Sequence, residues 1–165
     1  MPRSLLIMRH AKSSWRGDFH DHQRPLDERG RRAAAEMGER LPATGLRPDL
    51  VLCSDAERTR ETLERMHVAA GERWPSRLLA ELYLPRPDDM IRVATAAPGE
   101  VGTLLLLGHN PACEEVIERL TGARVVMKTA FLARLETDLP WSALLEAREG
   151  DVALIGVVRP AVEDD

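Results

Sequence analysis

The chain has 165 residues and a formal charge of −4 at pH 7, with 44% hydrophobic and 30% charged residues. These values predict one soluble globular domain, residues 1–165, with enough chain for a substantial core. The negative charge argues against a nucleic-acid binder, and the apolar runs are too short to cross a membrane. Two cysteines, and no secretory signal before the first apolar run, lead us to expect a reducing cytoplasm.

In chain order, the first 120 residues alternate between apolar runs of strand length and segments of helical pattern. Strands are predicted at 4–8, at 50–53, more weakly at 78–82, and at 101–107. Helices are predicted at about 27–41, ended by Pro42, and at 55–70, 88–97 and 111–120. Residues 11–26 are polar and irregular, long enough for a functional loop. This alternation predicts a three-layer α/β/α sandwich with a mostly parallel central sheet.

The last third of the chain has fewer helical patterns. Residues 131–137 alternate, 144–148 form a short apolar piece, and 151–158 are apolar, with a turn predicted at 149–151. We therefore expect this part to extend the sheet. The acidic end of the chain, residues 161–165, is expected to be a frayed tail.

Polar side chains follow three of the predicted strands. Arg9 and His10 come directly after the first strand, Arg58 lies one turn into the helix after the second, and His109 follows the strand at 101–107. Ligands bind at the carboxyl ends of strands in open α/β sheets, so these side chains are expected to meet. A neutral histidine can attack phosphorus, and guanidinium groups offer forked donors to phosphoryl oxygens. Each piece alone is weak evidence, but their order and placement predict a phosphoryl site.

In that order, the three stretches resemble the histidine phosphatase superfamily, also called the phosphoglycerate mutase-like family. The stretches are residues 5–13, 53–62 and 104–111, and residues 21–30, with the sequence DHQRPLDERG, are similar to its small-phosphatase branch. Within the family, the chain looks most like the SixA-type phosphohistidine phosphatases, and the resemblance covers nearly the whole chain. It implies a phosphoglycerate mutase-like fold.

The resemblance also implies roles for individual residues. His10 would be the nucleophile, and Arg9, Arg58 and His109 would bind and neutralise the transferring phosphoryl group. Ser13 and Asn110 are further candidates for substrate binding. No metal or other cofactor is expected. His20 and His22 flank Asp21, but no fourth ligand follows at a spacing typical of zinc sites.

The loop after His10 departs from the family pattern Arg-His-Gly-x-Ser-x-Trp-Asn. Here residues 9–16 read RHAKSSWR, so that Ala11 replaces the glycine and Arg16 replaces the asparagine that helps to bind phosphate. Arg16 or Lys12 is a candidate for the missing contact. Both side chains could equally point to solvent.

The proton donor for the leaving group is the second open question. Many family members carry a glutamate after the third strand, and Glu81 is the candidate here, with Asp18 and Asp21 as alternatives. Glu81 could instead be a surface carboxylate. General acid catalysis contributes roughly 10²–10⁴-fold, and an alkoxide leaving group needs it more than phosphohistidine, whose leaving nitrogen can already be protonated.

These patterns predict a phosphatase that works through a phosphohistidine on His10 and acts on phosphohistidine in a protein. The short chain leaves little room for a lid, which favours an open site that admits a protein surface. The alternatives are a phosphatase for small esters, such as sugar or nucleotide-derived phosphates, and a non-catalytic phosphate-binding module. Expected partners are a phosphorylated protein or a small phosphate ester, with no nucleic acid and no membrane. The oligomeric state stays open.

Overall fold

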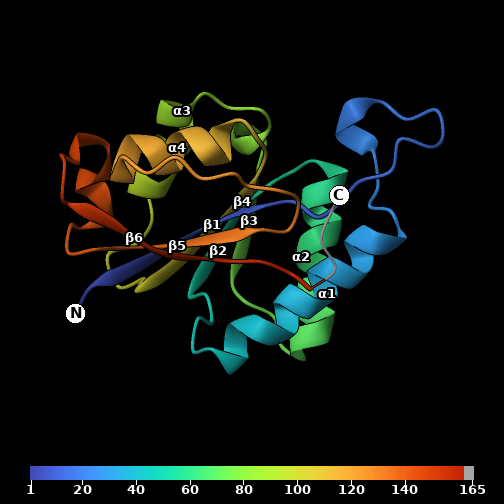
Figure 1. The fold of residues 1–165 in the computed structure, drawn as a ribbon, viewed down its shortest axis with the longest axis horizontal. Helices are drawn as coiled ribbons and strands as arrows, with labels where there is room; N and C mark the ends of the chain where they lie inside the picture. The colour runs from blue at the N-terminus through green and yellow to red at the C-terminus, as the bar shows by residue number, and fades with distance from the viewer. Residues whose placement is uncertain (162–165) are drawn as a thin grey trace.

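The computed structural model describes residues 1–161 and contains one six-stranded sheet with the strand order β3-β2-β4-β1-β5-β6 (Figure 1). The strands are β1 (Arg3–Arg9), β2 (Leu50–Ser54), β3 (Ser76–Leu79), β4 (Thr103–Gly108), β5 (Leu132–Thr137) and β6 (Val152–Val158). β3, β2, β4 and β1 run parallel, whereas β5 pairs antiparallel with both β1 and β6. The mostly parallel sheet is thus confirmed. Most of the expected frayed tail, residues 162–165, lies outside the described residues.

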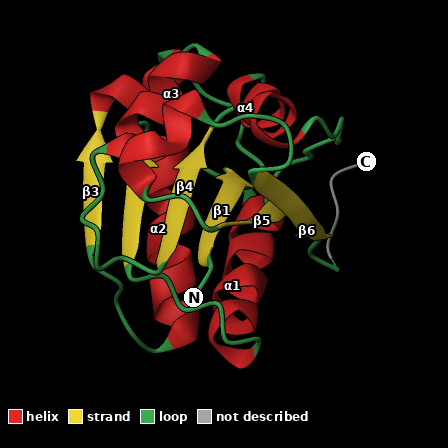
Figure 2. Cartoon of the chain, turned by 90° about the vertical axis from the view of Figure 1, so that its left-hand side faces the viewer, coloured by secondary structure: helices red, strands yellow, loops and turns green. Residues whose placement is uncertain are grey.

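Helices cover both faces of this sheet, as the three-layer prediction requires (Figure 2). One face carries α1 (Glu28–Ala43) and α2 (Glu57–Ala70), and the other carries α3 (Pro87–Thr95) and α4 (Ala112–Thr121). No helix within residues 1–161 combines the length and the apolar character needed to cross a bilayer.

The sheet separates two hydrophobic cores, and β1 contributes to both. Leu5 and Ile7 belong to the core under α3 and α4, whereas Leu6 and Met8 belong to the core over α1 and α2. All four are fully buried. Successive side chains of a strand point to opposite faces, so a continuous apolar run is what a strand covered on both sides needs.

Three local predictions are wrong. Pro42 lies inside the last turn of α1 instead of before its end, and the helix continues for one further residue, to Ala43. The strand expected at 78–82 is β3 at Ser76–Leu79, followed by the 3₁₀ helix η2 (Ala80–Leu82). The piece at 144–148 adds no strand, because η3 (Trp141–Glu146) buries Trp141 and Leu144 in the core beside α3.

The glycine at position 30 connects the fold to the site. Gly30 lies in the first turn of α1, where the Asp27 side chain caps the helix by accepting a hydrogen bond from the Gly30 amide at 2.8 Å. A Cβ atom on Gly30 would clash with the backbone carbonyl of Lys12. Glycine therefore lets α1 support the loop that follows β1, and this loop carries part of the site.

Candidate active site

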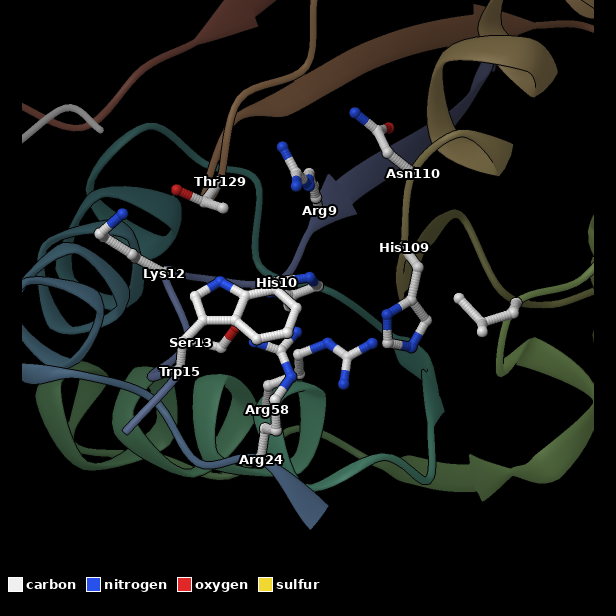
Figure 3. A pocket seen from close by; sticks show the side chains of 11 residues that line it. Arg9, His10, Lys12, Ser13, Trp15, Arg24, Arg58, His109, Asn110 and Thr129 are labelled. Atoms are coloured by element: carbon white, nitrogen blue, oxygen red, sulfur yellow. The ribbon is translucent and has the colours of Figure 1, made fainter. Parts of the chain in front are cut away.

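The carboxyl ends of β1, β2 and β4 meet at a cavity of about 200 Å³. Six residues predicted for the site line this cavity: Arg9, His10, Ser13, Arg58, His109 and Asn110 (Figure 3). Lys12, Trp15, Arg24, Leu84 and Thr129 complete the lining. Two predicted residues, Arg16 and Glu81, are not among the lining residues. The strand-end prediction is therefore confirmed as a spatial cluster, while the catalytic role of each residue stays a prediction.

His10 follows β1 directly and is only 6% exposed. Its Nδ1 lies 2.7 Å from the carbonyl oxygen of Ala11. A carbonyl only accepts, so Nδ1 carries the proton and Nε2 keeps a lone pair. Burial is the largest effect on the ring and lowers the pKa of His10 well below its usual value, with His109, Arg58 and Arg9 acting in the same direction. The geometry thus provides a neutral imidazole with one nucleophilic nitrogen.

His109 follows β4 and lies beside His10, with 5.3 Å between the two ring centroids. Its Nε2 is 2.8 Å from the hydroxyl oxygen of Ser54 at the end of β2. Its Nδ1 is buried and has no hydrogen-bond partner within residues 1–161. Burial, and then the positive charge of Arg58, lower the pKa of His109 to about 3. When Ser54 donates to Nε2, the neutral ring can donate its Nδ1 proton to an anion in the cavity.

Two arginines bring permanent positive charge to the site. Arg9 ends β1, and one of its terminal nitrogens donates to the carbonyl of Met127 at 3.2 Å. Arg58 lies in the first turn of α2 and is 4% exposed. Its Nη1 donates to the backbone oxygen of Asp21 at 2.7 Å and its Nη2 to the carboxylate at 3.1 Å. Both guanidinium groups are held in place, as a preorganised anion site requires.

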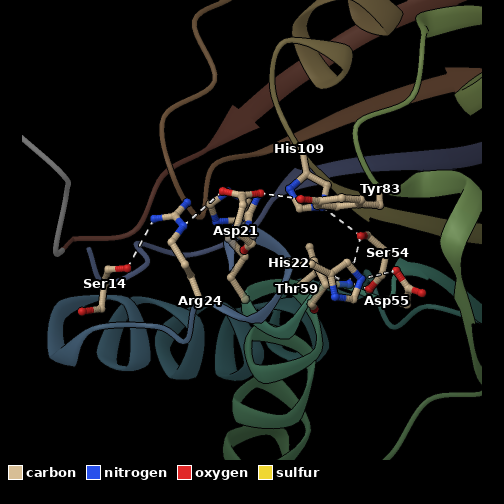
Figure 4. A network of polar contacts seen from close by, with 12 residues as sticks. Ser14, Asp21, His22, Arg24, Ser54, Asp55, Thr59, Tyr83 and His109 are labelled. Carbon is tan, nitrogen blue, oxygen red and sulfur yellow. Dashed lines mark hydrogen bonds and ion pairs between the residues drawn. The ribbon is translucent and has the colours of Figure 1, made fainter. Parts of the chain in front are cut away.

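Arg24 is a cavity residue that the sequence reasoning missed. It is 8% exposed, and its guanidinium lies 3.5 Å from the ring centroid of Trp15. Its Nε donates to the Asp21 carboxylate at 3.2 Å and its Nη1 to the carbonyl of Ser14 at 3.3 Å (Figure 4). The available signal was its place in the stretch at 21–30 that resembles the small-phosphatase branch. No strand-end rule indicates a residue in the middle of a loop.

The remaining binding candidates are placed differently from one another. Ser13 lies at the cavity and is 8% exposed. Asn110 also lines it, but its amide nitrogen donates to the carbonyl of Met127 at 2.8 Å and to Glu114 at 3.1 Å, so that the amide holds a neighbouring loop. Arg16 is exposed and lines a separate hollow next to the cavity, whereas Lys12 lines both. Lys12 is thus placed at the cavity, and Arg16 is not.

The structure does not bring Glu81 to the cavity. β3 ends at Leu79, and the following turn of η2 leaves Glu81 exposed while Leu82 enters the core. Tyr83 comes next and donates its hydroxyl proton to the Asp21 carboxylate at 2.5 Å (Figure 4). Glu81 as the leaving-group acid stays a prediction that no contact supports.

Of the alternative acids, Asp21 is held as a carboxylate. The hydrogen bond from Tyr83 is the largest effect and lowers the pKa of Asp21 to about 2. Its proton is therefore absent at neutral pH. Asp18, the other alternative, is exposed and is not among the residues that line the cavity.

The electrostatics of the cavity suit a dianion. Among the residues that the structure describes, its lining contains four cationic side chains and no carboxylate. At its mouth, Trp15 is 80% exposed and Leu84 is 56% exposed, so that the cavity opens onto an apolar surface. Within residues 1–161, no group of three or more His, Cys, Asp and Glu side chains is placed to hold a metal ion. The arrangement can bind a phosphoryl group and present a histidine nitrogen to its phosphorus.

Comparison with known proteins shows which family this chain resembles. The family model described as histidine phosphatase superfamily (branch 1) matches residues 5–83. An uncharacterized protein of Mycobacterium tuberculosis is 40% identical over 144 residues, which cover 86% of each chain. An uncharacterized chloroplastic protein of Arabidopsis thaliana is 31% identical over 144 residues, which cover 81% of this chain and 66% of that protein.

A solved structure shares the fold over almost its whole length. This protein, from Nakamurella multipartitia, is described as a candidate phosphohistidine phosphatase SixA. It is 29% identical to this chain, superimposes with a TM-score of 0.86, and the match covers 98% of both chains.

Proposed function

Because this chain belongs to the histidine phosphatase superfamily, in its SixA-type branch, we propose that it hydrolyses phosphohistidine on a protein through a covalent intermediate on His10. The observation that carries the proposal is the neutral His10 ring. Its proton is held on Nδ1 by the Ala11 carbonyl, which leaves Nε2 as the nucleophile in a cavity lined by four cations.

In the first step, the lone pair of His10 Nε2 forms a bond to phosphorus while the bond from phosphorus to the substrate nitrogen breaks. The electron pair of the broken bond stays on that nitrogen. A substrate ring that carries a proton on its other nitrogen then departs as neutral imidazole, so that the enzyme need not supply a proton. Arg9, Arg58 and neutral His109 stabilise the charge on the three equatorial oxygens.

In the second step, a water oxygen bonds to phosphorus and the bond to His10 Nε2 breaks. The electron pair returns to Nε2, and the released phosphate keeps both protons of the water. The hydrogen bond from Nδ1 to the Ala11 carbonyl retains the ring proton throughout, at 2.7 Å in the free protein. The phosphorylated ring therefore stays in the protonated form, from which neutral imidazole is the leaving group.

Two features support phosphohistidine on a protein over a small phosphate ester. Within residues 1–161, no carboxylic acid lines the cavity to protonate an alkoxide, since Glu81 lies away from it and Asp21 is ionised. The mouth with Trp15 and Leu84 exposed offers an apolar surface to a protein partner. The alkoxide of a small phosphate ester would leave less readily in such a site, because nothing there protonates it.

We also place the reaction in the cytoplasm. Cys53 and Cys113 are free and buried, as is common in reducing compartments. Burial raises the pKa of each thiol to about 12, so neither competes with His10 as a nucleophile.

The test compares the wild type with His10→Ala on two substrates, a histidine-phosphorylated protein and p-nitrophenyl phosphate. We expect the wild type to release phosphate from the protein and to hold an acid-labile phosphoryl group after rapid denaturation, and the variant to do neither. His20→Ala, which changes an exposed histidine of the same loop, is the matched control and should behave as the wild type. If the wild type turned over neither substrate, the proposal that this protein is a phosphatase would be refuted. If His10→Ala were as fast as the wild type, His10 could not be the nucleophile.

A further inference from the structure

We propose that the Asp21 carboxylate determines the leaving-group specificity of this site: it favours a leaving group that carries a positive charge, such as ring-protonated imidazole, and disfavours one that departs as an anion. The inference rests on the proposed function, because it concerns which group leaves the phosphorus.

Asp21 is bonded to three side chains that come from separate parts of the chain. One carboxylate oxygen accepts hydrogen bonds from the Tyr83 hydroxyl at 2.5 Å and from Arg58 Nη2 at 3.1 Å. The other accepts from Arg24 Nε at 3.2 Å. These bonds fix the carboxylate against Arg24 and Arg58, two of the four cations that line the cavity. Figure 4 shows Asp21 beside Arg24.

The position of Asp21 decides which part of a substrate it meets. Arg24 and Arg58 line the cavity, whereas Asp21 is not among the lining residues. The carboxylate contacts the guanidinium groups of both arginines, and 45% of the Asp21 side chain is exposed beside the cavity. In the proposal, the group attached to the phosphorus leaves the cavity on this side and meets the negative charge.

That charge persists at every pH at which a phosphatase would work. The bond from Tyr83 and the two arginines lower the pKa of Asp21 to about 2. Asp21 consequently cannot donate a proton at neutral pH, but it can accept a hydrogen bond from the N–H of a cationic ring. A specificity role fits the Asp21 carboxylate better than a proton-donor role does, because the carboxylate is already ionised.

The two classes of leaving group respond in opposite directions. A phosphohistidine ring that is protonated on its distal nitrogen is stabilised near Asp21, and this is the form whose N–P bond breaks to release neutral imidazole. An aryl phosphate breaks its P–O bond with the electron pair left on oxygen, so that negative charge develops near the carboxylate. A carboxylate attracts a nearby positive charge and repels a nearby negative one, and the partial exposure of Asp21 reduces both effects.

The variant Asp21→Asn removes the charge and keeps the shape. We expect the ratio of kcat/KM for a histidine-phosphorylated protein to that for p-nitrophenyl phosphate to fall about 10-fold. Asp18→Asn is the matched control, because it removes the same charge from an exposed position in the same loop, and it should leave the ratio unchanged. Asp21→Glu should restore most of the ratio. If both rates fall equally in Asp21→Asn, the residue only positions Arg58 and the inference is wrong.

A binding measurement separates this inference from the proposed function. Aminomethylphosphonate and phosphonoacetate share a phosphonate but carry a cationic and an anionic substituent, and calorimetry measures their Kd without turnover. We expect the wild type to prefer aminomethylphosphonate and Asp21→Asn to lose about 10-fold of that preference. An unchanged preference would overturn the role of Asp21 even if phosphohistidine is hydrolysed. Loss of preference without any turnover would support Asp21 and refute the proposed function.

Discussion

The two sides of the cavity are built in different ways. The strand-end wall, comprising Arg9, His10 and His109, is held by the sheet: Arg9 pairs with Gly108 in the parallel register, and the His10 amide donates to the Gly108 carbonyl at 3.0 Å. Backbone hydrogen bonds between neighbouring strands therefore fix the positions of the Cα atoms that carry these side chains. Such a wall is rigid before any ligand binds.

The loop rim, comprising Trp15, Asp21, Arg24 and Tyr83, is held by side chains. Its bonds connect the loop after β1 with the turn after η2, and Asp21 and Tyr83 are 62 residues apart. Trp15 is 80% exposed, whereas His10 in the wall is 6% exposed. We infer that the wall supplies the chemistry and that the rim selects what reaches it. Changes in the wall should therefore reduce turnover most, and changes in the rim should reduce it less or alter specificity.

The largest effect that tests this division is expected from His109→Gln. The variant keeps a neutral side chain, but glutamine cannot place an N–H donor where Nδ1 of the His109 ring lies. We therefore expect kcat/KM for the phosphorylated protein to fall roughly 10²–10³-fold. His20→Gln is the control. A loss below about 3-fold, with an unchanged melting temperature, would show that the wall does not carry the chemistry.

A smaller effect is expected in the rim, from Arg24→Gln. Arg24 lines the cavity and Arg16 does not, although the two are identical side chains in one loop. We expect Arg24→Gln to lower kcat/KM about 10–100-fold and Arg16→Gln to change it less than about 2-fold. Equal losses in the two variants would mean that membership of the loop, and not contact with the cavity, determines the loss of kcat/KM.

The histidines of the wall should also make stability depend on pH. His109 has a pKa of about 3 in the folded protein, and the pKa of His10 is likewise lowered, against about 6.5 when unfolded. The unfolded chain thus binds more protons below pH 6.5, and the free energy of unfolding should fall as pH decreases, by at most about 1.4 kcal/mol per pH unit for each ring.

Two measurements check this expectation. Urea unfolding between pH 7 and pH 4 gives the slope, and imidazole ¹⁵N shifts should show the His109 ring neutral at pH 5 and the His10 ring neutral at pH 6. Either ring protonated at pH 6 would contradict a desolvated wall. In His109→Gln, the dependence of the unfolding free energy on pH should decrease by the contribution of the His109 ring.

The smallest effect is expected from Glu81→Gln. Because Glu81 is exposed and away from the cavity, we expect a change of less than about 2-fold in kcat/KM for either substrate. A 10-fold loss confined to p-nitrophenyl phosphate would instead make Glu81 the leaving-group acid. The rim would then contribute directly to the chemistry, and the division between wall and rim would not hold.

The sequence by itself determined the layered fold and the wall. Apolar runs such as Leu104–Leu107 can only be buried on both sides, so that strands must lie between two helical layers, and polar residues that follow them directly must share one edge. The ends of two helices could also be predicted from capping residues. Asp27 caps the start of α1, and Gly71, with a φ of 71°, caps the end of α2.

Only the tertiary structure decided the rim. The same loop holds Arg16 and Arg24, and only the family resemblance of residues 21–30 distinguishes them in the sequence. Arg24 is held at the cavity by bonds to Ser14 and Asp21. Likewise η2 turns Glu81 outward and leaves Tyr83 to reach Asp21. The direction of a loop side chain depends on partners that are distant in sequence, such as Arg58, 37 residues beyond Asp21. A strand end inherits its direction from the sheet, and a loop residue acquires its direction from contacts that exist only after folding.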